Sequence, residues 1–169
     1  GSGKTYSVVE FLKEHKDMKI YANIKSLKGV NYEYFEGFEQ LLQLRNAQNC
    51  IIFYDEIFTA LTKSSRMSTE VLDFLSQMRK RNIIFLTTAQ EWLEINITLR
   101  RYCRFQIDCH IFSPFFLPKS LLIKVFKDAE KMKWDNLENE YVAPVLSTTI
   151  SKCNLDVANS YDTYEQIRS

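Results

Sequence analysis

The sequence has little glycine and proline and almost no excess of charge of either sign. Its 169 residues include 4 Gly and 3 Pro, too few for a collagen-like chain or for long flexible linkers. The 22 basic and 21 acidic side chains leave a net charge of +1, so the composition as a whole does not indicate a nucleic-acid partner. With 46% hydrophobic and 25% charged residues, the chain is expected to form one globular α/β domain.

Metal-binding cysteine patterns and membrane spans are also missing. The cysteines and histidines are Cys50, Cys103, Cys109, Cys153, His15 and His110. None forms a Cys-x-x-Cys pair, which argues against a tetrahedral zinc site. Cys50 and Cys103 lie in apolar runs, and we expect them to be buried and reduced. No run approaches the roughly 20 apolar residues of a membrane span, and the first residues do not have the pattern of a signal peptide.

A phosphate-binding motif opens the chain. Gly1-Ser2-Gly3-Lys4-Thr5 corresponds to the end of the loop pattern G-x-x-x-x-G-K-S/T, and the apolar residues of a helix follow. Gly3 would let the backbone approach a phosphate closely, and the successive N–H groups of the loop would bind it. Lys4 would reach the β- and γ-phosphates of ATP, and the Thr5 hydroxyl would help to hold Mg²⁺. An ordinary glycine-rich start or an expression scar is the alternative.

The first half of this loop is not in the sequence. The first glycine of the pattern would lie before Gly1, and a buried strand would precede it. We therefore expect the chain to begin inside its own nucleotide loop, without the first strand of its sheet.

Apolar runs and helical spacing predict the other elements. Strands are expected at residues 19–24, 50–54, 82–88, 102–111 and 121–126, with helices around residues 38–44 and from residue 68 onward. Helices between apolar strands favour a parallel sheet covered by helices. Strand 82–88 is expected to lie between the missing first strand and strand 50–54.

Two carboxylates follow the buried run at residues 51–54. Asp55 and Glu56 would lie at the carboxyl edge of a parallel sheet, where open α/β sheets bind ligands. We expect Asp55 to hold Mg²⁺, directly or through water, and Glu56 to polarise the water that attacks the γ-phosphate. The alternative is a strand that ends in a solvated acidic turn.

A polar segment, Thr87-Thr88-Ala89-Gln90, ends the next apolar strand. We favour Gln90 as a sensor that contacts the attacking water or the γ-phosphate. The alternative is a helix that begins here, for which Thr88 would be a suitable N-cap.

Basic residues are clustered locally although the chain is nearly neutral. Between residues 76 and 104 they are Arg79, Lys80, Arg81, Arg100, Arg101 and Arg104. A second cluster of lysines lies between residues 119 and 133. Such clusters can be solvated faces, contacts to a phosphate backbone, or arginine fingers for a neighbouring subunit. Arg100 and Arg101 are the better finger candidates, because they follow the sensor strand after a short helix-like segment.

Together these segments resemble a family of P-loop ATPases. The segments are GSGKT, KIYANI, IIFYDEI, LSQMRKRNIIFLTTAQ and LRRYCRFQIDC, within residues 1–112. They resemble the FtsK/HerA group, and within it the Zot-like (zonular occludens toxin domain) and phage DNA-packaging ATPases. In these proteins an Asn follows the second strand, as Asn23 does, and the sensor strand ends in Thr-x-Gln. Unlike the Zot proteins of filamentous phages, this sequence has no transmembrane segment after the core.

The resemblance implies an ASCE/RecA-like P-loop NTPase, with a mostly parallel sheet and helices on both faces. It implies a core at residues 1–112 and a C-terminal extension of the same domain at residues 113–169. It further implies Mg²⁺-dependent ATP hydrolysis that drives DNA translocation or packaging in a homo-oligomeric ring, with an Arg from the neighbouring subunit at each ATP. The expected location is the cytoplasm, that of the host if the protein is viral. A Zot-like assembly or secretion ATPase, or a switch that acts on protein partners, is the alternative.

Overall fold

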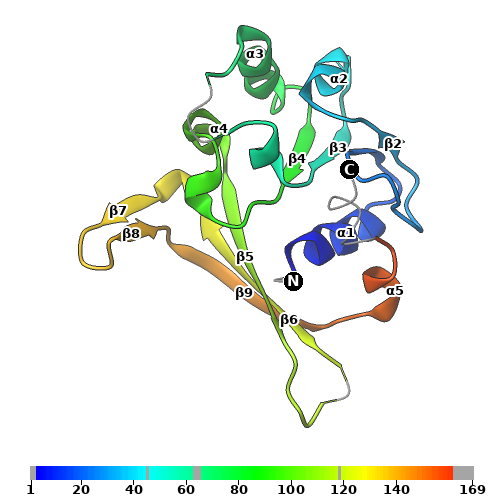
Figure 1. Ribbon diagram of the computed structural model, residues 1–169, viewed down its shortest axis with the longest axis vertical. Helices are drawn as coiled ribbons and strands as arrows, with labels where there is room; N and C mark the ends of the chain where they lie inside the picture. The colour runs from blue at the N-terminus through cyan, green and yellow to red at the C-terminus, as the bar shows by residue number, and fades with distance from the viewer. Residues whose placement is uncertain (1–2, 45, 63–65, 118, 162–169) are drawn as a thin grey trace.

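A computed structural model of the protein describes residues 3–44, 46–62, 66–117 and 119–161 (Figure 1). Gly1 and Ser2 of the phosphate motif lie outside the described residues. The helices are α1 (Lys4–Glu14), α2 (Phe38–Gln43), α3 (Thr69–Gln77), α4 (Ile97–Tyr102) and α5 (Leu155–Ala158). The strands are β1 (Lys19–Ala22), β2 (Glu33–Tyr34), β3 (Cys50–Tyr54), β4 (Ile83–Thr87), β5 (Phe105–Phe112), β6 (Leu121–Asp128), β7 (Lys133–Asp135), β8 (Glu140–Val142) and β9 (Val145–Lys152).

Four parallel strands form the central sheet in the order β2-β1-β3-β4. All five residues of β3 are buried, as the continuous apolar run predicted. Ile51 and Phe53 belong to the core cluster that contains residues of α1, while Ile52 belongs to the cluster that contains residues of α2 and α3. Helices therefore cover both faces of the sheet, and the predicted α/β class is confirmed.

Strand β4 lies beside β3 but is less buried than expected. The sequence predicted a strand as enclosed as β3, yet Ile84 is 36% exposed and only Ile83 is buried. The reason is its position: β4 pairs with β3 along one edge, and within the described residues no strand pairs with its other edge. An apolar strand needs neighbours on both edges and faces to be enclosed.

A second, antiparallel sheet follows, in the order β5-β6-β9. It packs against α1 through Cys109 and Leu122, which belong to the same core cluster as that helix. An ion pair of 2.9 Å between Lys124 of β6 and Glu10 of α1 joins the two elements. The predicted strand at residues 102–111 begins only at Phe105, because α4 extends through Tyr102.

The C-terminal segment returns to α1. Val157 of α5 joins the core cluster of that helix, and Lys13 forms an ion pair of 3.0 Å with Asp156. The Tyr6 hydroxyl accepts a hydrogen bond of 2.7 Å from the Asn154 backbone. The division into a core and an extension at residue 112 falls at the end of β5, and it stays a prediction.

Two further observations concern membrane spans and the burial of the cysteines. None of the helices in the described ranges has both the length and the apolar character needed to cross a bilayer. Cys50 is buried as expected, but Cys103 is only partly buried, because it lies where α4 turns into β5. Burial still raises the pKa of the Cys103 thiol to about 11.

Candidate nucleotide site

The phosphate loop ends at Gly3, from which α1 begins. Gly3 adopts a left-handed conformation with φ of +85°, which L-residues with a side chain rarely adopt. The next two residues, Lys4 and Thr5, form the first turn of α1, so their backbone N–H groups lie at the positive end of the helix. This arrangement favours binding of an anion.

The second sheet supports this loop from behind. A Cβ atom on Gly3 would lie 2.9 Å from side-chain carbons of both Ile111 in β5 and Leu122 in β6. Real Cβ atoms essentially never come this close to a neighbour, so a larger residue here would force these side chains to shift, in addition to the strain of the positive φ. The antiparallel sheet thus contributes to the shape of the loop.

Strand register brings three polar residues together at the carboxyl edge of the parallel sheet. Ala22 of β1 is in register with Phe53 of β3, and Tyr54 of β3 is in register with Thr87 of β4. The residues that follow these strand ends, Asn23, Asp55 and Thr88, then leave the sheet side by side. This is the edge at which open α/β sheets bind their ligands.

Asp55 is the centre of this group. The residue is 7% exposed, and the Thr5 hydroxyl donates to its Oδ1 over 3.5 Å, near the long limit of a hydrogen bond. The Thr88 hydroxyl donates to the same oxygen. A hydroxyl and a carboxylate are the hard oxygen ligands that Mg²⁺ prefers, so the residues fit this ion. The described residues contain no group of three or more His, Cys, Asp or Glu side chains that could hold a metal. Phosphate oxygens and water would therefore complete the coordination.

Asn23 fixes the backbone of Asp55. Its side-chain oxygen accepts a hydrogen bond of 2.6 Å from the Asp55 N–H, and its amide donates one of 3.1 Å to the Asp55 carbonyl. This reciprocal pair holds the end of β1 against the end of β3. The Asn that the family resemblance pointed to therefore has a direct structural role here.

Glu56 is held in an unusual conformation beside Asp55. Its φ of +51° lies in the left-handed region, which costs a residue other than glycine about 1–3 kcal/mol. Its backbone N–H donates a hydrogen bond of 2.9 Å to the Thr88 hydroxyl. Burial, and secondarily the negative charge of Asp55, raise the pKa of Glu56, while the Lys4 ammonium partly offsets this rise. A raised pKa improves a carboxylate as a proton acceptor near neutral pH.

The structure assigns to Thr88 the contacts that the sequence interpretation did not foresee. Thr88 is buried and binds both Asp55 and Glu56, and it is not a helix N-cap, since the next helical turn begins after Glu91. Gln90 is exposed and forms no hydrogen bond within the described residues. Aligning the ends of the two apolar strands would have placed Thr88 beside Asp55. The sensor role of Gln90 stays a prediction.

The two arginines proposed as fingers lie in the last turn of α4. Arg101 is exposed, whereas Arg100 is partly buried and its guanidinium carbon lies 5.9 Å from the ring centroid of Tyr141 in β8. Within the described residues, neither arginine forms an ion pair with Glu56. This arrangement is compatible with a role at a neighbouring subunit.

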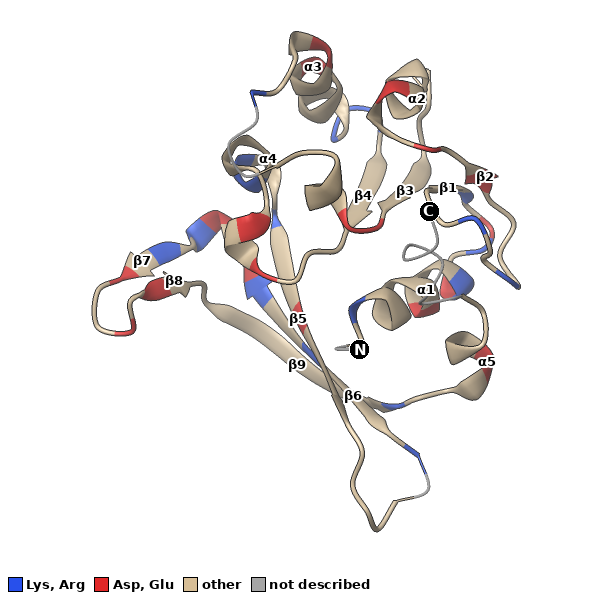
Figure 2. Cartoon of the chain, in the orientation of Figure 1, with Lys and Arg blue, Asp and Glu red and all other residues tan. Residues whose placement is uncertain are grey.

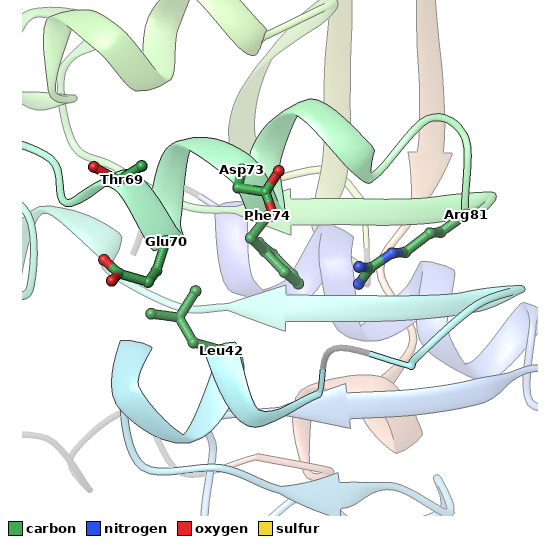
Figure 3. A pocket seen from close by; sticks show the side chains of 6 residues that line it. All are labelled: Leu42, Thr69, Glu70, Asp73, Phe74 and Arg81. Atoms are coloured by element: carbon green, nitrogen blue, oxygen red, sulfur yellow. The ribbon is translucent and has the colours of Figure 1, made fainter.

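A pocket of about 290 Å³ lies elsewhere, between α2 and α3 (Figure 3). The side chains that line it are Leu42, Thr69, Glu70, Asp73, Phe74 and Arg81. It contains none of the residues that surround Asp55, and it is a mixture of apolar and oppositely charged groups. We do not assign it to the nucleotide.

Comparisons with known proteins agree with this geometry. The sequence model of a family described as "ATPase family associated with various cellular activities (AAA)" matches residues 1–113. No curated protein sequence matches the chain significantly. Among solved structures, the N-terminal domain of zonular occludens toxin from Neisseria meningitidis is similar with a TM-score of 0.58 and 19% identity, over 96% of this chain and 94% of that chain.

A second similar structure is that of a viral protein. The genome packaging NTPase B204 from Sulfolobus turreted icosahedral virus 2, in complex with ATP-gammaS, has a TM-score of 0.55 and 11% identity. The match covers 84% of this chain and 91% of that chain. At these identities, both likenesses show a shared fold.

Proposed function

Because the chain belongs to the ATPase family associated with various cellular activities (AAA), we propose that it is a motor that couples Mg²⁺-dependent ATP hydrolysis to DNA translocation or packaging. The chain is a P-loop enzyme that hydrolyses ATP. The observation that carries the proposal is the convergence of Thr5, Asp55, Glu56 and Thr88 at one edge of the sheet.

Each of these residues has a role in the proposed hydrolysis. The first turn of α1 binds the phosphates, and Lys4 neutralises charge on the β- and γ-phosphates. Thr5 and Asp55 would hold Mg²⁺, which would neutralise phosphate charge when bound. Glu56 orients the attacking water and accepts its proton. Thr88, bonded to both carboxylate residues, keeps Glu56 in position relative to Asp55.

Two observations support the DNA part of the proposal. The similar protein B204 is a genome packaging NTPase, and FtsK/HerA membership of this chain is part of the proposal. Basic residues gather around α4 and along residues 119–133, although the net charge is only +1. Such local clusters can bind a phosphate backbone.

Stimulation by DNA tests the proposed function. We expect ATP turnover by the purified protein to rise when double-stranded DNA is added, and the rise to shrink with added salt, because phosphate contacts release counterions. Phosphate release would be measured with DNA, with heparin as a polyanion control, and with no addition. Equal rates in all three conditions would contradict a DNA motor.

The similarity to zonular occludens toxin favours a second candidate function. An ATPase of phage assembly or secretion, or a nucleotide switch, would act on a protein partner. Such a protein would hydrolyse ATP through the same site but would not respond to DNA. The DNA experiment therefore separates the two candidates.

We also propose that the protein acts as a homo-oligomeric ring in which Arg100 or Arg101 completes the site of the next subunit. A subunit with both arginines replaced by Ala and a subunit carrying Glu56→Gln should each be inactive alone. Mixed in equal amounts, they form about one interface in four that pairs an intact Glu56 with intact arginines, if assembly is random. Partial recovery of ATP turnover is the expected result.

The mixture needs an assembly control. Light scattering should show that both variants and their mixture assemble like the wild type. With intact assembly, absence of recovery at every mixing ratio would show that the arginines do not act across an interface.

A further inference from the structure

The turn between β5 and β6 carries the most exposed aromatic side chains of the described residues. The Pro114 carbonyl accepts a hydrogen bond of 3.1 Å from the Leu117 backbone, so Phe115 and Phe116 occupy the two central positions of a β-turn. Phe115 is 99% exposed and Phe116 is 69% exposed, and their rings meet edge to face at 5.4 Å. In Figure 1 this hairpin extends away from the rest of the molecule at the bottom of the view.

The base of the hairpin is held by hydrogen bonds. The hydroxyls of Ser113 and Ser120 lie 2.7 Å apart, and the Ser120 carbonyl accepts a bond of 2.8 Å from the Cys153 backbone just beyond β9. Phe112, the last residue of β5, is exposed next to this base. We call the projecting group the apolar tip; it consists of Phe112, Phe115, Phe116 and Leu117.

The end of the hairpin that carries the apolar tip has only basic charged residues. From residue 109 to residue 127 the sequence contains no Asp or Glu. Lys124 and Lys127 are used in ion pairs with Glu10 and Asp108. Two more lysines, at positions 119 and 152, are exposed and have no ion pair within the described residues. Both lie at the base of the hairpin: residue 119 comes two positions before the start of β6, and residue 152 is in register with residue 121, the first residue of β6.

The other projecting hairpin, β7–β8, provides a contrast within the same molecule. Its turn carries Leu137, which is 95% exposed, but Asp135, Glu138 and Glu140 lie beside it. In Figure 2 the ribbon around this turn is coloured for Asp and Glu, whereas the ribbon near the tip of the β5–β6 hairpin is coloured only for Lys and Arg among charged residues. Both hairpins therefore expose an apolar side chain at their turn, but only the turn of the β5–β6 hairpin has no acidic residues beside it.

We propose that the apolar tip inserts into the headgroup region of an anionic lipid bilayer and holds the protein at a membrane surface. Transfer of exposed aromatic rings from water into the bilayer lowers the free energy, and flanking lysines are attracted to anionic lipids. A partner that is at once apolar and negatively charged matches both properties of the tip. Binding would be peripheral, without a segment that crosses the bilayer. It is independent of the proposed function, because membrane binding needs neither ATP hydrolysis nor DNA movement.

Vesicle flotation tests the proposal directly. The purified protein is expected to float with vesicles of phosphatidylcholine and phosphatidylglycerol, to float poorly with phosphatidylcholine alone, and to be released by salt. Phe115→Ser together with Phe116→Ser should weaken binding roughly a hundredfold, since two aromatic side chains no longer leave water. Lys119→Glu should weaken binding to the anionic vesicles. Leu137→Ser, the matched control on the acidic hairpin, should bind like the wild type.

Two results would overturn the proposal. One is that the wild type fails to float with anionic vesicles, or that the double Phe variant floats equally well. The other is that the double variant changes the oligomeric mass in light scattering while no form binds vesicles, which would identify the tip as a protein contact. Retained ATP turnover in the double variant would show that its fold is intact, so failure of this proposal is distinguishable from failure of the proposed function.

Discussion

Replacing Glu56 by Gln is expected to abolish ATP turnover and to leave nucleotide binding nearly unchanged. Glutamine has almost the same shape and keeps the backbone hydrogen bond to Thr88, but it cannot accept a proton from the attacking water. Loss of a positioned general base lowers a rate by about 10²–10⁴-fold. Lys4 and Thr5, which we propose contact the phosphates and Mg²⁺, are not altered by this change.

The measurements are single-turnover ATP hydrolysis and calorimetric titration with a non-hydrolysable ATP analogue. Glu36→Gln is the matched control, because Glu36 is an exposed glutamate that follows β2, a strand separated from β3 by β1, and it should keep the wild-type rate. Turnover of Glu56→Gln at the wild-type rate would remove Glu56 from the mechanism.

Glu56→Gln should raise the stability of the fold at neutral pH, although it abolishes ATP turnover. Burial and the charge of Asp55 raise the pKa of Glu56, so the folded protein binds a proton that the unfolded chain has already released. Stability is then lost as pH rises from the ordinary pKa of a glutamate, about 4.3, through the raised one. Glu56→Gln removes this loss. Urea denaturation should therefore show the variant to be more stable than the wild type at pH 7, and the difference should disappear below about pH 4.

The parts of the fold that the sequence predicted well are those with strong, local patterns. Cys50–Tyr54 is a continuous apolar run, and the structure buries all five residues as β3. The helix expected from residue 68 is α3, with the Ser68 hydroxyl accepting from the Val71 backbone. In both cases the determining signal lies within the element itself.

The strands that were not predicted depend on contacts distant in sequence. Strand β9 is mostly polar, with Ser and Thr at four of its eight positions and no long apolar run, and it exists because it pairs with residues 121–127 of β6. The partial exposure of β4 likewise reflects its neighbours and not its own residues, which are as apolar as those of β3.

The candidate site shows the same division. Asp55 and Glu56 could be named from sequence, because two carboxylates directly follow a buried strand. The role of Thr88 depends on the register between β3 and β4, in which Tyr54 lies beside Thr87. The sequence favours Gln90 unless the ends of the two apolar strands are aligned, and that alignment is fixed only by the strand register.

Replacing Thr88 by Val is expected to lower ATP turnover about 10²-fold with little effect on nucleotide binding. Valine has the shape of threonine but can neither donate to Asp55 nor accept from the Glu56 backbone. The Glu56 N–H then loses its partner, which costs about 1–3 kcal/mol where the group is buried. Because the left-handed conformation of Glu56 needs support from its surroundings, we expect its carboxylate to leave the position in which it activates water.

Two further variants separate this role from simple destabilisation and from the alternative sensor. Thr88→Ser keeps the hydroxyl, so it should retain most of the turnover even though it loses a buried methyl group. Gln90→Ala removes an exposed side chain that has no hydrogen bond within the described residues. If Thr88 positions Glu56, turnover should follow the order wild type, Thr88→Ser, Thr88→Val, as measured by phosphate release at saturating ATP. If instead Gln90→Ala is inactive and Thr88→Val turns over like the wild type, the γ-phosphate is sensed by Gln90, and the hydrogen bonds of Thr88 serve only to hold the ends of β3 and β4 together.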